Sequence, residues 1–263
     1  MSTVLGELLS YLLQTVSLVI VGIHSVRLMR VSRGSMVLVF FTFALFSLLT
    51  VNCYWISYNL IRPDSRMPIA ASEIGECATQ LLLAESLKAA FRNRFGDARR
   101  ELALTCLFTA ASIALWIAWT GEWVQDIVGG LAFGYYLCRS VWALKLSGAL
   151  LRCEWSFTGA AAALLVALET AQFFVPARQK ALLDLACYLL MTLSVLYFSV
   201  KTLRALRTGT DGKQPFACAF AFYAWIVSCI YMSEGGWYIA WEILAALLLP
   251  LMFLAIKREV EAE

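Results

Sequence analysis

The hydrophobic residues of this chain form long runs, and short polar segments separate one run from the next. At 1.5 Å per helical residue, a run of about 20 residues crosses about 30 Å of hydrocarbon. The runs lack the strict alternation of apolar and polar residues that marks a membrane β-barrel. The pattern therefore predicts an all-α, polytopic transmembrane helix bundle of about nine spans, at residues 4–25, 36–61, 67–88, 102–121, 127–150, 156–175, 181–201, 215–232 and 237–256.

The third of these segments differs from the others because it carries several charges. Residues 69–90 read IAASEIGECATQLLLAESLKAA and include three glutamates and a lysine. Such a helix crosses the bilayer with its carboxylates facing other helices, or lies along the membrane surface, or re-enters from one side. If residues 67–88 are interfacial, eight spans remain.

The distribution of Lys and Arg residues favours a third segment that crosses. With nine crossings, sixteen of the 21 basic residues fall in one set of loops, and the opposite set holds Arg62, Arg66, Arg178 and Lys180. In membrane proteins the basic loops are the cytoplasmic ones. We therefore predict that the N-terminus is outside and the C-terminus is cytoplasmic. Without the third crossing, every later loop would change sides and the asymmetry would be lost.

The composition is that of an integral membrane protein. Of the 263 residues, 61% are hydrophobic and 15% are charged, whereas soluble domains carry about 25% charged residues. We expect a single integral membrane domain over residues 1–263, located in the plasma (inner) membrane. The net charge of +3 is small, and the basic residues gather at helix ends. The expected partner is therefore the lipid bilayer, and no nucleic acid is expected.

Polar side chains inside the predicted spans are the candidates for function. A charged group at the membrane centre costs about 2.5–3.5 kcal/mol on insertion scales, so it usually faces the bundle interior and finds a partner. In the outer half to middle of the spans, five carboxylates stand against one clear cation, Arg139. We expect Arg139 to pair with Glu76 or Glu169. The predicted cavity is lined by Asn52, Glu73, Glu76, Gln80, Arg139, Glu169, Gln172, Asp184 and Glu242.

An acid-lined cavity that opens outward would suit a small cationic solute, a metal ion or protons. The first hypothesis is therefore a transporter or channel for such a species. Glu73, Asp184 and Glu242 lie within a turn or two of the outer interface, so a simple contact with water remains an alternative for them. The sequence identifies no cofactor and no metal site, because its one histidine is His24 and its eight cysteines form no C-x-x-C pair.

Two other functions remain open. A membrane sensor or assembly subunit would dock a cytoplasmic protein partner or anionic lipid heads through a basic loop. An intramembrane enzyme would use the paired carboxylates Glu73 and Glu76 on a lipid-linked substrate. The chain has no nucleophile elbow and no Walker loop, so we rank the enzyme last. The candidate docking residues are Arg92, Arg94, Arg99 and Arg100.

Two clusters of small residues predict close contacts between helices. One is Gly130-x-x-x-Gly134 in the fifth span, and the other is GAAAA at residues 159–163 in the sixth. Small residues at this spacing let the backbones of two membrane helices approach closely.

Overall fold

The secondary structure of the described residues is entirely α-helical. The structure is a computed structural model that describes residues 2–32, 34–62, 71–91, 98–120, 123–208 and 212–262. Within these ranges there are nine helices and no strand, so the predicted all-α bundle is confirmed. The helices are α1 (Ser2–Val31), α2 (Met36–Ile61), α3 (Ala71–Ala90), α4 (Ala98–Thr120), α5 (Trp123–Ser147), α6 (Arg152–Ala171), α7 (Ala177–Thr208), α8 (Lys213–Tyr231) and α9 (Gly235–Ala262).

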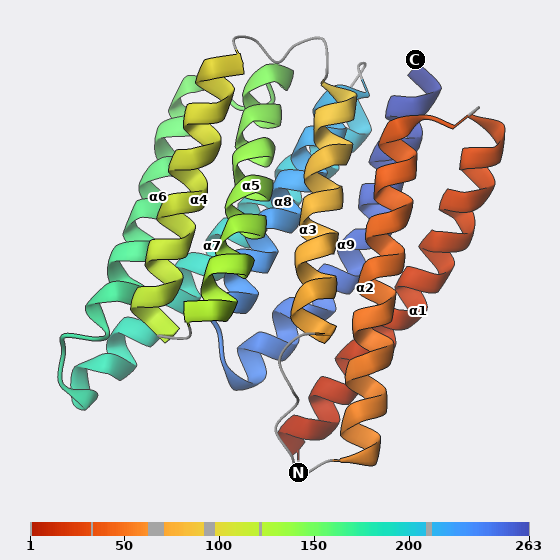
Figure 1. The fold of residues 1–263 in the computed structure, drawn as a ribbon. Coiled ribbons are helices and arrows are strands. Elements are labelled where there is room, and N and C mark those ends of the chain that lie inside the picture. Colours follow the sequence, from red (N-terminus) through yellow and green to blue (C-terminus); the bar gives the residue numbers. More distant parts are fainter. Residues whose placement is uncertain are drawn as a thin grey trace.

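Seven of these helices are long and apolar enough to span a membrane, namely α1, α2, α4, α5, α7, α8 and α9. The other two, α3 and α6, are each 20 residues long and carry several charged residues. Helix α3 nevertheless packs against α2 and α5 and runs along the bundle, not across one of its ends (Figure 1). The crossing of α3 stays a prediction, because α3 is not among the seven helices that are apolar enough to span a membrane.

Successive helices run in opposite directions, so their termini gather at two ends of the bundle (Figure 1). The end where α1, α3, α5, α7 and α9 begin is here called the acidic end. The opposite end, where α9 finishes, is called the basic end. The basic end carries Arg30, Lys88, Arg99, Arg100, Lys145, Arg152, Lys201, Arg204, Arg207, Lys213, Lys257 and Arg258.

Helix α8 lies at the centre of the bundle and contacts α5, α7 and α9. Phe216, Phe220 and Ile226 are fully buried, and most residues between them are buried too. A helix that is apolar on all sides belongs in a core. Helix α4 is the opposite case, because most of its apolar surface is exposed, including Leu102 and Leu107. Such a surface is suited to contact with lipid.

Glycines hold α4 and α5 close together. A Cβ on Gly134 would lie 2.6 Å from the Cα of Thr109, and a Cβ on Gly130 would lie 2.9 Å from the Cα of Ile113. The close approach predicted for these two glycines is therefore confirmed, with α4 as the partner. The prediction is wrong for Gly159, where a Cβ would meet no atom within 4 Å, because this position of α6 borders an apolar cavity.

Candidate functional site

A cavity of about 740 Å³ lies among the helix termini at the acidic end. The amino-terminal parts of α3, α5 and α7 and the carboxyl-terminal parts of α4, α6 and α8 line it. We call it the end cavity, and its volume is in the range of about 300–1,000 Å³ found for ligand pockets. Its charged lining residues are Glu73, Glu76, Asp126, Glu169, Lys180, Asp184 and Glu234.

Negative charge dominates the end cavity. Within the described residues, six carboxylates line it against one ammonium group, that of Lys180. Glu73 accepts a hydrogen bond of 3.0 Å from the Ser72 hydroxyl and takes part in further interactions. None of the other five carboxylates forms an ion pair within 4.0 Å with a described basic residue. Carboxyl groups therefore outnumber ammonium groups six to one among the described residues of this lining.

Neutral donors hold two of these carboxylates in place. The Gln172 side-chain amide donates to Glu169 Oε2 at 3.2 Å. The Thr120 hydroxyl donates to Asp126 Oδ2 at 2.6 Å. Such hydrogen bonds orient a carboxylate without cancelling its charge.

Aromatic side chains line the same cavity. They include Trp116 and Trp119 from α4, Tyr188 from α7 and Tyr231 from α8. The Trp116 and Tyr231 rings meet edge to face, with their centroids 4.7 Å apart. The faces of aromatic rings attract cations, and this attraction strengthens when water is excluded. The lining therefore combines the two kinds of group that recognise organic cations.

A second cavity, of about 340 Å³, lies between α1, α2, α3, α8 and α9. We call it the core cavity. It shares Glu76, Tyr231 and Ser233 with the end cavity, so these residues stand between the two spaces. The Tyr231 hydroxyl accepts a hydrogen bond of 2.7 Å from the Gln80 amide and donates one of 3.4 Å to Glu76 Oε2. A short polar chain therefore connects the cavities.

The structure brings eight of the nine predicted site residues into these adjoining cavities. Their role in binding stays a prediction, but their proximity is a property of the fold. Those in the end cavity are Glu73, Glu76, Glu169, Gln172 and Asp184, and those in the core cavity are Asn52, Glu76, Gln80 and Glu242.

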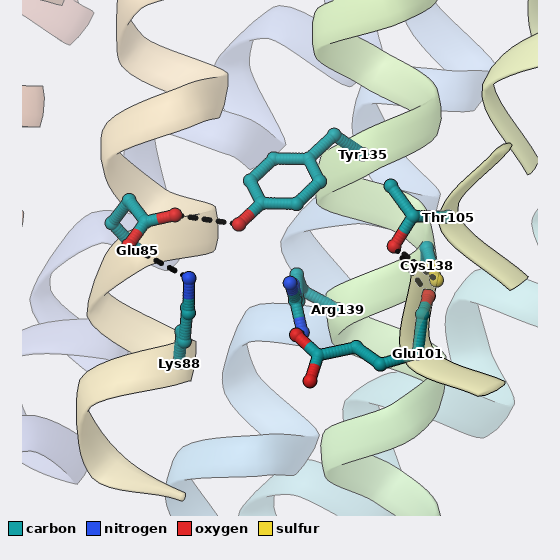
Figure 2. A network of polar contacts seen from close by, with 7 residues as sticks. All are labelled: Glu85, Lys88, Glu101, Thr105, Tyr135, Cys138 and Arg139. Atoms are coloured by element: carbon teal, nitrogen blue, oxygen red, sulfur yellow. Dashed lines mark hydrogen bonds and ion pairs between the residues drawn. The ribbon is translucent and has the colours of Figure 1, made fainter. Parts of the chain in front are cut away.

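Arg139 is the ninth predicted residue, and it lies in neither cavity. The expectation that it pairs with Glu76 or Glu169 is wrong, because its guanidinium pairs with Glu101 of α4. The guanidinium carbon also lies 4.9 Å from the ring centroid of Tyr135. Helix α5 runs from the acidic to the basic end, so Arg139 is past its middle and reaches the first turn of α4 (Figure 2).

The same network reaches α3. Figure 2 shows Tyr135 directed toward Glu85, and its hydroxyl donates to Glu85 Oε1 at 2.5 Å. Lys88 approaches the other carboxylate oxygen of Glu85 at 3.9 Å. Polar contacts thus link α3, α4 and α5 on the basic side of the bundle, away from the end cavity.

Other carboxylates toward the basic end also face a base. Lys201 of α7 binds Glu154 of α6 at 2.7 Å, and Lys213 of α8 approaches Glu259 of α9 at 3.9 Å. Glu154 precedes the predicted span of its helix. Burial raises the pKa of Glu154, but the hydrogen bonds from Lys201 and from the Leu151 N–H lower it more, so the pKa lies below its ordinary value.

Three charged residues of the end cavity were not predicted from the sequence. They are Asp126, Lys180 and Glu234, which lie at or just beyond helix ends. Charges at helix ends are expected at any membrane interface, so their positions in the sequence do not mark them as members of a site. Only the assembly of six helix ends around one space brings them together.

Of the predicted docking residues, Arg92 and Arg94 lie outside the described residues. Arg99 and Arg100 are exposed in the first turn of α4.

Among the residues that the structure describes, no group of three or more His, Cys, Asp or Glu side chains is placed to hold a metal ion. Comparisons of the chain with protein-family models, with curated proteins and with solved structures find no match.

Proposed function

We propose that this membrane protein is a transporter of the plasma membrane, and that it binds a small organic cation, an amine or a quaternary ammonium compound, in the end cavity. The observation that carries the proposal is the charge of that cavity. Five carboxylates without an ion-pair partner among the described residues share it with Lys180. A bound cation would offset their mutual repulsion.

The aromatic lining favours an organic cation over a bare metal ion. Trp116, Trp119, Tyr188 and Tyr231 offer ring surfaces, which suit a substituted ammonium group. A divalent metal ion requires several ligands at fixed distances, and the described residues contain no group of three candidate ligands placed for it.

The contrast between the two ends of the bundle supports transport. A transporter exposes its site to one side of the membrane at a time. The end cavity lies at the acidic end, whereas Glu101–Arg139 and Glu154–Lys201 connect helices toward the basic end. With the acidic end outside, as the loop charges predict, the protein has the form of an outward-facing state.

Uptake into proteoliposomes tests the proposal, with radiolabelled choline as the probe. We expect Glu76→Gln and Glu169→Gln to reduce the initial uptake rate at least tenfold, about 1.4 kcal/mol, because each removes one negative charge from the cavity. Glu261→Gln is the matched control, since Glu261 is exposed near the carboxyl terminus and lines no described cavity. Wild-type uptake rates in both cavity variants would refute the proposal.

A further inference from the structure

The core cavity contains hydrogen-bond acceptors that the protein leaves unused. Asn52 is 0% exposed and Gln80 is 5% exposed. In the described structure, neither Asn52 Oδ1 nor Gln80 Oε1 has a hydrogen-bond partner. A buried acceptor without a partner costs about 1–3 kcal/mol, so two in one small space require an explanation.

Donors in the lining are largely committed to other groups. The Asn52 amide donates to the Thr15 hydroxyl at 3.5 Å, and the Gln80 amide donates to Tyr231 at 2.7 Å. The Tyr11 and Tyr238 hydroxyls bond to each other at 2.8 Å. The Tyr223 hydroxyl and the remaining protons of these groups can solvate an acceptor, but they carry no positive charge.

Two carboxylates complete this set of acceptors. Glu76 and Glu242 both line the core cavity, and Glu242 is buried. Glu242 receives a hydrogen bond of 3.2 Å from the Gln14 amide. No basic residue lines this cavity within the described part of the chain. The two unused amide oxygens and the two carboxylates therefore converge here from α2, α3 and α9, with no positive charge among the described lining residues to match them.

We propose that the core cavity is a second binding site, which holds one small hydrated cation of the sodium type. Alkali and other hard cations bind to carboxylate and amide oxygens, the groups found here. A volume of about 340 Å³ has room for the ion and several waters, each of which takes about 30 Å³ in the liquid. The site differs from the end cavity, but the shared Glu76 places the two cations within electrostatic reach of each other.

A comparison of thermal stability in two salts tests this site. The purified protein is heated in sodium chloride and, at equal ionic strength, in the chloride of the much larger alkali cation caesium. We expect sodium to raise the Tm of the wild-type protein in a saturable manner, because a ligand that binds only the folded state stabilises it by mass action. Equal Tm values in the two salts, at all concentrations, would overturn the proposal.

Two leucine substitutions in α2 identify the site. Asn52→Leu should abolish the response to sodium. In caesium chloride it should be at least as stable as the wild type, because the substitution removes an unpaired buried acceptor. Asn59→Leu is the matched control, since Asn59 donates to the Trp55 carbonyl and lines neither cavity. A full sodium response in Asn52→Leu would contradict the assignment.

The proposal deepens the proposed function but can fail separately from it. Glu169 lines only the end cavity, so Glu169→Gln should keep the sodium response while losing the response to choline. A Tm that changes with pH but not with the identity of the salt would mean that Glu76 or Glu242 binds a proton instead of a metal cation. That result would refute the sodium site. An equal response to potassium would support the site and broaden its selectivity.

Discussion

The two ends of this bundle treat their carboxylates differently. Toward the basic end, Glu101, Glu154 and Glu259 each lie beside a base contributed by another helix. At the acidic end, carboxylates such as Glu169 and Asp184 share the end cavity with one lysine among the described residues. The same residue type therefore has two environments within one molecule.

This difference separates a structural role from a functional one. A paired carboxylate between two helices is explained by the contact that it makes, and nothing more is required. An excess of carboxylates around a cavity has no such internal explanation, because like charges that are close together oppose folding. The comparison predicts that changes at the basic end affect stability first, and that changes at the acidic end affect binding first.

The largest effect on stability should come from Arg139→Leu. Loss of one partner from a buried pair costs about 3–5 kcal/mol. The lower end of that range applies here, because the Glu101 side chain that remains is 22% exposed and reaches water. We expect a decrease in Tm of roughly 6–12 °C in detergent. The double variant Arg139→Leu with Glu101→Leu should recover most of the loss, because an apolar pair can replace a buried ion pair. An unchanged Tm in Arg139→Leu would contradict the structural role of the pair.

The second largest effect should be on choline binding by the double variant Glu169→Gln with Asp184→Asn. Removal of two charges from the end cavity should weaken choline binding at least tenfold, about 1.4 kcal/mol. Without ligand, the Tm should stay the same or rise slightly, because repulsion among the carboxylates decreases. Isothermal titration and thermal unfolding measure the two quantities. A large loss of stability would mean that these carboxylates are structural.

A smaller effect should appear as a pH dependence at Glu154. Its pKa is lower in the folded protein than in the unfolded chain, so the stabilisation is present above the unfolded value of about 4.3. It is lost as the pH falls from there through the folded value. In Glu154→Gln this contribution is absent. The difference in Tm between wild type and variant should therefore be constant from pH 5 to pH 7, and should decrease below about pH 4.3. A difference that grows on acidification would reverse the sign that we infer.

The smallest effect should come from the ion pair near the carboxyl terminus of α9. The Lys257 Nζ lies 3.7 Å from Glu261 Oε1, and the two side chains are 47% and 57% exposed. Exposed pairs at this spacing contribute about 0.3–0.5 kcal/mol. Lys257→Ala should therefore change the Tm by no more than about 2 °C. This variant is the control with which the decrease in Tm of Arg139→Leu is compared.

The helices could be predicted from the sequence because apolar runs of membrane length leave few alternatives. The central position of α8 and the packing of α3 against α5 could not be predicted, because they depend on which helix faces are complementary in shape. Arg139 shows the same limit. The span boundaries predict the depth of Arg139, but its partner depends on the first turn of α4, where Glu101 lies just outside the predicted span.

The candidate site was predictable where a polar residue lies inside an apolar span. Glu76, Gln80 and Glu169 are conspicuous in such a context, and the cost of burying them points to an interior position. Asp126 and Glu234 are not conspicuous, because charged residues are common at the ends of membrane helices. Their membership of the end cavity follows from the convergence of helix ends, which the order of residues does not reveal.

The most direct test of the central claim compares two ligands of the same shape. Choline carries a positive charge, and its carbon analogue dimethylbutanol does not. In thermal unfolding of the wild-type protein in a caesium chloride solution free of organic amines, choline should raise the Tm in a saturable manner and dimethylbutanol should not. An equal response to both ligands, or a choline response that persists after Glu169→Gln with Asp184→Asn, would contradict the claim that unmatched carboxylates make the end cavity a cation site.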